Sequence, residues 1–282
     1  MPSLPEVEVL RRDIDKEIVG RRIKDAEVRP GPGAMHAIRP HSKRKDFIDL
    51  VRDTKLENVE RRGCRLLLEL DSSNWLIVDP GSRGRLLKTG AGDELDSHTH
   101  VVMTFTIGGQ LRFVDTGKDG AIYVVPSAEA DKLRAGGFKL DPLDPENPLA
   151  WQHMSQLLEA RSAPLKRLLL DEDFIAGLGD VYSDEILFNS GLRYDHLSDQ
   201  LSSQDVRRFY RALLETLTDA VKAGGASIAS AEFTDLSGKP GEYQLEMKVY
   251  GRAGEACPRC RNTIVKERYE SSETYFCPQC QS

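Results

Sequence analysis

The chain has 282 residues, of which 39% are hydrophobic and 30% are charged, and its formal net charge is −6. This length allows about two domains, and the composition is that of a soluble globular protein. The acidic balance excludes a global attraction to polyanions, because the first 150 residues carry 24 basic against 25 acidic side chains and the rest carry 15 against 20. Phosphate binding would have to come from local basic patches, at residues 39–45 and 60–65, unless these are simply solvated faces.

Membrane and secretory signals are missing from the sequence pattern. No window approaches the roughly 18 uninterrupted apolar residues of a membrane span. The first residues have no apolar core of signal-peptide length. Four of the five cysteines fall in the last 26 residues, which favours metal ligation in a reducing compartment over a disulfide framework. We therefore expect a cytoplasmic protein without membrane contact.

The first predicted element is an amphipathic helix that ends near Gly20. Its apolar residues recur three or four positions apart and form one face: Val7, Leu10, Ile14 and Ile18. Short strand-like segments follow from about residue 22 to 125, separated by turns rich in Gly, Pro and Asp. They predict a two-sheet sandwich or barrel.

The second half of the chain differs from the first in composition and in hydrophobic periodicity. Residues 126–150 are rich in Pro, Gly and Asp and are expected to form a linker with room for one short helix. Helical periodicity fills residues 151–230, where the longest helix begins at a Ser cap and ends at Gly224–Gly225. Residues 231–282 return to short strands. The expected α+β order is a β domain with an N-terminal helix (1–125), the linker, a helical domain and a metal module.

The cysteine spacing identifies that metal module. Cys257 and Cys260 form one pair two residues apart, and Cys277 and Cys280 form another after 16 residues. Each pair places two thiolates on one tight turn, and two facing turns complete a tetrahedral zinc site. All four positions are filled by protein, which leaves none for water or substrate. The predicted zinc is therefore structural and positions the hairpin between the two pairs.

Four segments together resemble the formamidopyrimidine-DNA glycosylase/endonuclease VIII family of base-excision enzymes. They occur in the family's order and are MPSLPEVE, ERRGCRLLLEL, IAGLGDVYSDEILFNSGL and VYGRAGEACPRC…TYFCPQCQ. The resemblance implies an N-terminal β-sandwich, a helix–two-turn–helix domain and a zinc finger. It also implies a monomer that binds damaged double-stranded DNA. The family reaction displaces a damaged base with the N-terminal proline and cleaves the strand through an iminium intermediate.

Carried over residue by residue, the resemblance makes Pro2 the nucleophile and Glu6 a second catalytic-site residue. A secondary amine suits this chemistry, because its iminium forms without further deprotonation; the alternative for Pro2 is an ordinary helix-entry proline. Two family catalytic positions are substituted. Ser3 stands where the family has the acid/base glutamate, and Cys64 stands where it has the turn lysine. Cys64 is a new nucleophile or, more simply, a half-buried structural cysteine.

The resemblance also implies six DNA-contacting positions: Lys118, Lys166, Gly177, Gly179, Asp180 and Ser272. Two of them are substituted, since Asp180 replaces an asparagine and Ser272 replaces the zinc-finger arginine. In the loops that would fill the void left by an extruded nucleotide, Ser82 and Asp119 stand where apolar or aromatic wedges are expected.

These substitutions leave three functions open. The chain is a glycosylase/lyase of reduced or altered activity, or a catalytically inactive family member that binds DNA or a protein, or a protein with a non-nucleic-acid function around Cys64.

Overall fold

The structure is a computed structural model that describes residues 2–136, 140–229, 232–270 and 272–282. The chain divides into two compact units. The first comprises residues 1–136 together with 223–242, and the second comprises residues 137–222 together with 243–282. Each unit is therefore built from two segments that are separated in the sequence. The segment 223–242 belongs with the β-rich unit, although in sequence it lies between the helical domain and the metal module.

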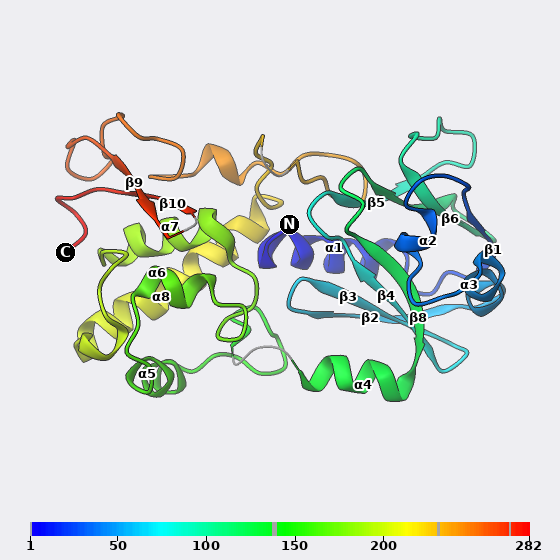
Figure 1. Cartoon of the computed structure of the whole chain (residues 1–282), viewed down its shortest axis with the longest axis horizontal. Coiled ribbons are helices and arrows are strands. Elements are labelled where there is room, and N and C mark those ends of the chain that lie inside the picture. Colours follow the sequence, from blue (N-terminus) through cyan, green and yellow to red (C-terminus); the bar gives the residue numbers. More distant parts are fainter. Residues whose placement is uncertain (1, 137–139, 230–231, 271) are drawn as a thin grey trace. The chain divides into compact units, whose positions relative to one another are not determined.

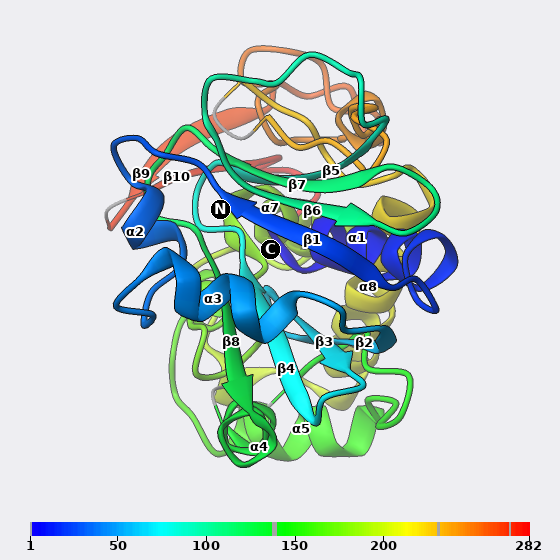
Figure 2. The same ribbon diagram turned by 90° about the vertical axis from the view of Figure 1, so that its right-hand side faces the viewer.

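The first unit is a two-layered sandwich of antiparallel strands with helices around it (Figures 1 and 2). One sheet has the order β1-β6-β7-β5 and the other the order β2-β3-β4-β8. The strands are β1 (Ile23–Val28), β2 (Leu56–Arg62), β3 (Arg65–Leu70), β4 (Asn74–Asp79), β5 (Gly84–Thr89), β6 (Thr99–Phe105), β7 (Gln110–Asp115) and β8 (Ala121–Pro126). The helices are α1 (Leu4–Glu17), α2 (Ala34–Ala37), α3 (Arg44–Val51) and α4 (Ser127–Ala135). The predicted sandwich is confirmed.

Strands β3 and β4 each contain an uninterrupted apolar run, residues 66–68 and 75–78, because both of their faces are covered. The inner face packs in the sandwich, and α4 covers the outer face of β4 and β8. Their outer cluster consists of Leu67, Trp75, Ile77, Val125 and Ala130, with Tyr123 and Leu133 packed against it. The segment expected as a linker therefore contributes a helix that buries apolar sheet surface.

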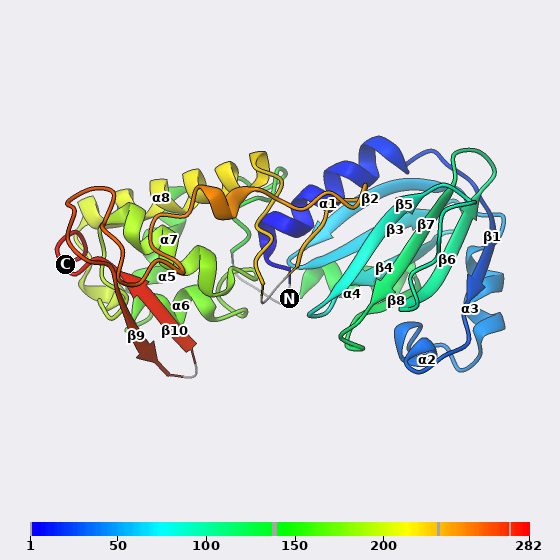
Figure 3. The ribbon, with the colours of Figure 1, turned by 90° about the horizontal axis from the view of Figure 1, so that it is seen from above.

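Helix α1 packs against β2 and β3 through the predicted apolar face, all four residues of which are buried (Figure 3). The helix ends at Glu17, one turn before Gly20, whose φ of +87° turns the chain toward β1. Glu8 also lies on the buried face, only 3% exposed. Its Oε2 accepts a hydrogen bond from Arg61 Nε on β2 at 3.0 Å, and both side chains are almost completely enclosed.

The charge of Glu8 is stabilised by three guanidinium groups. Arg11 and Arg12, one turn further along α1, donate to the same carboxylate at 2.9–3.1 Å. Burial alone would raise the pKa of Glu8, but the hydrogen bonds from the three arginines outweigh it and hold the pKa below its usual value. Glu8 is therefore an ionised anchor between α1 and β2.

The second unit is helical and ends in a hairpin. Its elements are α5 (Trp151–Glu159), α6 (Leu165–Leu170), α7 (Gly179–Ser190), η1 (Ser198–Gln200), α8 (Ser203–Lys222), η2 (Tyr243–Leu245), β9 (Val265–Tyr269) and β10 (Ser272–Phe276). Helix α7 packs against α6, α8 and β10. The expected Ser cap of the longest helix is Ser202, whose hydroxyl oxygen accepts the Asp205 N–H at 3.2 Å. Among the described residues, no helix is sufficiently long and apolar to cross a membrane.

Replacing Arg61 by alanine should lower the free energy of unfolding by about 3–5 kcal/mol, because Glu8 would lose a buried partner. Arg12→Ala is the matched control: it removes a bond to the same carboxylate, but the Arg12 side chain is 58% exposed. We expect it to cost less than about 1 kcal/mol. Urea unfolding at pH 7 measures both values, and equal losses would contradict the anchor role. Because the pKa of Glu8 is lowered, its contribution is present above the ordinary carboxyl range and is lost as the pH falls through the folded-state pKa.

Candidate nucleic-acid interface and metal centre

The N-terminal residues are held by the carboxylate of Glu6. Pro2 is buried and directly precedes Ser3, the N-cap of α1. Glu6 Oε2 accepts the Ser3 N–H at 2.9 Å, and Oε1 accepts the Ala226 N–H at 2.7 Å. Gly225 has a φ of +81°, and a Cβ there would lie 3.0 Å from Glu6 Cγ. Glu6 thus connects the residue after Pro2 to the returning segment 223–242, and both of its oxygens already accept backbone bonds.

Cys64 lies in a two-residue turn between β2 and β3. Arg62 pairs with Arg65 across the turn, and Gly63 has a φ of +56°. Cys64 is half-buried. Arg61, the partner of Glu8, also donates from Nη1 to the Gly63 carbonyl at 3.3 Å. The buried ion pair therefore positions the turn on which Cys64 replaces the expected lysine.

The two loops expected to fill a void in DNA contact each other. They are residues 79–84, between β4 and β5, and residues 115–120, between β7 and β8. The Ser82 N–H donates to Asp119 Oδ2 at 2.9 Å, and the Ser82 hydroxyl donates to Oδ1 at 3.0 Å. Partial burial favours the neutral carboxyl, but these donors outweigh it and lower the pKa of Asp119. The two substituted wedge positions therefore form a hydrogen-bonded pair in which the Asp119 carboxylate is ionised.

Further contacts brace this loop pair. Asp115 accepts the N–H groups of Gly117 and Gly120 at 2.8 and 2.9 Å. Arg39, from the turn after α2, donates to the carbonyls of Gly120 and Asp119, both at 3.0 Å. A Cβ on Gly81 would lie 2.5 Å from the Gly120 nitrogen, so the close approach of the loops requires a glycine there.

Lys118 remains exposed at the tip of its loop. Its φ is +62°, a conformation uncommon for residues with a side chain. Its neighbour Asp119 faces Ser82 instead. The Lys118 side chain is therefore accessible to solvent, and its expected role in DNA binding stays a prediction.

Lys166 lies inside the second unit. Its side chain is fully buried, and Nζ lies 2.7 Å from Asp184 Oδ1 and 2.8 Å from Ser183 Oγ. Burial raises the pKa of Asp184 to about 6, although Lys166, Thr274 and a backbone N–H lower it. The ammonium of Lys166 is therefore already neutralised by a carboxylate, and the predicted phosphate contact would need it to turn outward.

Two more substituted positions contact each other at the start of α7. Ser272 Oγ of β10 donates to Asp180 Oδ2 at 3.4 Å. Asp180 Oδ1 lies 3.5 Å from Lys166 Nζ and makes no hydrogen bond among the described residues. Gly179 directly precedes Asp180 and is exposed with a φ of +64°, and Gly177 lies two residues before Gly179. A carboxylate thus lies at a helix N-terminus, where the helix dipole favours an anion.

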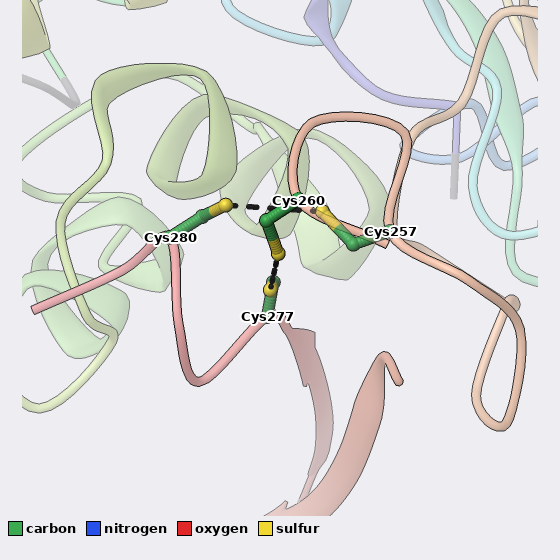
Figure 4. Close-up of side chains that lie close together, drawn as sticks. All are labelled: Cys257, Cys260, Cys277 and Cys280. Carbon is green, nitrogen blue, oxygen red and sulfur yellow. Dashed lines mark hydrogen bonds between the residues drawn. The ribbon is translucent and has the colours of Figure 1, made fainter. Parts of the chain in front are cut away.

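The four predicted zinc ligands converge at the base of the β9–β10 hairpin (Figure 4). Their sulfur atoms all lie within 4.8 Å of one another. Cys260 and Cys277 approach to 3.4 Å, and Cys257 and Cys280 to 3.9 Å, which exceeds the roughly 2.05 Å of a disulfide. With Zn–S bonds of about 2.3 Å, tetrahedral sulfurs lie about 3.8 Å apart, so the cluster fits zinc.

The thiol chemistry agrees with a metal. Burial favours the neutral thiol of Cys257, yet N–H donors including that of Arg259 lower its pKa to about 7. Burial and the neighbouring thiols raise the pKa of Cys280 to about 12. Four thiolates this close therefore ionise together only around a cation. The predicted structural zinc site is confirmed, since all four donors are protein sulfurs.

Comparison with known families covers nearly the whole chain. Residues 1–122 match the model of the formamidopyrimidine-DNA glycosylase N-terminal domain, residues 139–232 match that of the H2TH domain of the same enzyme, and residues 254–282 match the zinc finger found in FPG and IleRS. The chain belongs to the formamidopyrimidine-DNA glycosylase family. The predicted family, fold and zinc finger are confirmed, and membership makes the chain a DNA-repair glycosylase by descent.

Similar proteins extend over the same length. Formamidopyrimidine-DNA glycosylases of Desulfitobacterium hafniense and Pelotomaculum thermopropionicum are each 34% identical over 282 residues, covering all of this chain and 99–100% of theirs. Lactococcus lactis Fpg, solved with DNA containing an abasic site, matches with a TM-score of 0.84 at 27% identity over 99% of both chains. The MutM (Fpg) protein of Thermus thermophilus matches with a TM-score of 0.81 at 30% identity, over 99% of this chain and 98% of its own.

Sequence reasoning missed the residues that position these sites. Helical spacing could have identified Glu8, because its distance from Leu4 and from the apolar face places it on the buried side of α1. No comparable sequence pattern identifies Arg39, Asp115 or Ala226. Their partners lie far away in sequence, and arginine, aspartate and alanine at those positions look like ordinary surface or turn residues.

Cys277→Ser should abolish zinc binding and lower the melting temperature of the protein, because three thiolates and a hydroxyl no longer form the tetrahedral set. The matched control is Cys64→Ser, which removes the cysteine outside the cluster. Elemental analysis should find one zinc per chain in the native protein and in this control. Retention of zinc by the Cys277 variant would contradict the assignment.

Proposed function

We propose that the protein binds damaged double-stranded DNA and cleaves it at abasic sites by β-elimination, with the Pro2 amine as nucleophile after removal of Met1. The observation that carries this proposal is the double backbone contact of Glu6. Because it holds Ser3 and Ala226, the residue next to Pro2 has a defined position. The solved complex of Lactococcus lactis Fpg with abasic-site DNA supports the same class of ligand.

The reaction follows from amine chemistry. Neutral Pro2 nitrogen attacks the C1′ aldehyde of the abasic sugar, and loss of water forms a cationic iminium. The cation withdraws electrons, so a C2′ proton leaves, the C3′–O bond breaks, and the 3′ phosphate departs as the leaving group. Water then releases the protein. An α-amino group has a reference pKa near 8, so a useful neutral fraction is present at pH 7.

Excision of an intact damaged base should be the weaker activity. This step needs a proton donor at the base, and Ser3 offers a hydroxyl in place of a carboxylate. General acid–base catalysis contributes about 10²–10⁴ in rate. Glu6 is a poor substitute because both of its oxygens accept backbone hydrogen bonds. We therefore propose reduced or altered glycosylase activity together with retained lyase chemistry.

The affinity for DNA should also be lower than that of a protein with all of the family's phosphate contacts intact. Asp180 presents a carboxylate at the α7 N-terminus, and Lys166 is paired internally with Asp184. A carboxylate near a phosphate is repulsive. The same observation favours the second candidate, a catalytically inactive family member that binds DNA or a protein.

Borohydride trapping on an abasic-site oligonucleotide distinguishes these candidates. We expect a covalent adduct with the mature protein and a much lower yield with Pro2→Gly, because the primary amine of glycine lacks the fixed geometry of the proline ring. The double variant Ser3→Glu, Cys64→Lys should raise the lyase rate by about tenfold or more, if proton transfer limits it.

Two results would decide against lyase chemistry at Pro2. If no adduct forms at high protein concentration while DNA binding is retained, the second candidate function, a catalytically inactive binding module, remains. An adduct of equal yield in Pro2→Gly would show that the secondary amine of Pro2 is not required.

Asp180→Asn should tighten binding to abasic-site DNA by about three- to tenfold. The plot of log binding constant against log salt concentration should become steeper, by about the slope that one additional phosphate contact contributes. Asp173→Asn is the matched control, since it removes the same charge from an exposed position of the same unit. Titrations at several salt concentrations measure both quantities. If the two variants behave alike, Asp180 does not lie at a phosphate contact.

A further inference from the structure

The loop pair 79–84 and 115–120 lies at the same end of the sandwich as the N-terminus and the β2–β3 turn (Figures 1 and 3). From its chemistry we propose that the preferred lesion lies in an unpaired stretch of DNA, such as a bubble or gap flanked by duplex, rather than opposite a partner base. This inference rests on the proposed lyase function and names its substrate class.

The first argument is the chemistry of the loop tips. Bringing a nucleotide out of a duplex costs stacking and pairing, and proteins offset this cost by inserting apolar or aromatic side chains into the stack. The half-buried or exposed side chains at these two tips are polar or charged: Ser82, Arg83, Thr116, Lys118 and Asp119. Cationic side chains favour phosphates, and none of the five offers an apolar wedge.

The second argument is the pairing of Ser82 with Asp119. Inserting either residue between bases would break their hydrogen bonds at 2.9 and 3.0 Å. It would also bring an ionised carboxylate into a base stack without its donors, which is strongly unfavourable. The pair therefore opposes entry of the loops into a continuous duplex.

The third argument is that the loops cannot easily rearrange. Asp115 and Arg39 hold the backbone of residues 117–120 through four hydrogen bonds of 2.8–3.0 Å. The backbones of the two loops are in direct contact, since a Cβ on Gly81 would lie 2.5 Å from the Gly120 nitrogen. An alternative side chain cannot be presented without breaking several of these bonds.

An unpaired lesion removes the need for a wedge. Its nucleotide is already unstacked, so no void has to be filled and the cost of extrusion is lowest. Lys118 and Arg83 then meet a flexible single strand, whose phosphates can approach exposed cations from either side of the loop pair.

The test compares borohydride trapping rates on one abasic-site strand in two settings, fully paired and within a bubble of several unpaired nucleotides. We expect trapping in the bubble to be faster by about tenfold or more. The double variant Ser82→Met, Asp119→Phe supplies apolar wedges and should shrink this ratio by raising the rate on paired DNA. Asp49→Phe, on the exposed face of α3, is the control for the change in charge and size. Melting curves establish that each variant is folded.

The outcomes separate the two proposals. An adduct that forms at equal or higher rate on paired DNA overturns the substrate preference and leaves the lyase function standing. No adduct in either setting overturns the lyase function and with it this inference. If the double variant does not fold, the ratio measured for the native protein still decides.

Discussion

The buried ion pair between Glu8 and Arg61 is the constraint on which the N-terminal unit depends. A charge enclosed in a protein must have its partner at one geometry, so α1 can take one position against β2. That position places residues 2–6 at one end of the sandwich. Since Arg61 also holds the Gly63 carbonyl, it places the Cys64 turn as well. The proposed nucleophile and the substituted turn are thus located by one interaction that performs no chemistry itself.

Carboxylates at the positions substituted relative to the family also have hydrogen-bond partners within the protein. Asp119 and Asp180 are carboxylates where other chemistry is expected, and each meets a hydroxyl from a distant segment, Ser82 or Ser272. These substitutions are therefore coupled in pairs and not four independent losses. Each pair makes its contact within the protein, although Asp180 Oδ1 makes no hydrogen bond among the described residues. Binding DNA there has to compete with contacts that the chain already makes.

Local patterns were sufficient for much of the fold. The face of α1, the strand-rich region, the capped α8 and the zinc cluster all follow from spacings within a few residues or from two short cysteine pairs. The expected linker had room for a short helix, but the packing of α4 on the sheet and the return of residues 223–242 to the first unit follow from no such pattern. The first depends on an apolar sheet surface that needs covering. The second depends on Glu6, whose acceptors meet a backbone N–H 220 positions away.

The sequence by itself determined the family and the zinc ligands, and it supplied the proposed catalytic and DNA-contacting positions, because these are read from residue type and spacing. Only the tertiary structure decided what those residues do to one another. It turned Lys166 inward onto Asp184, engaged both oxygens of Glu6 and joined Ser82 to Asp119. The physical reason is that hydrogen-bond partners and burial are set by segments far apart in the chain, which no local spacing encodes.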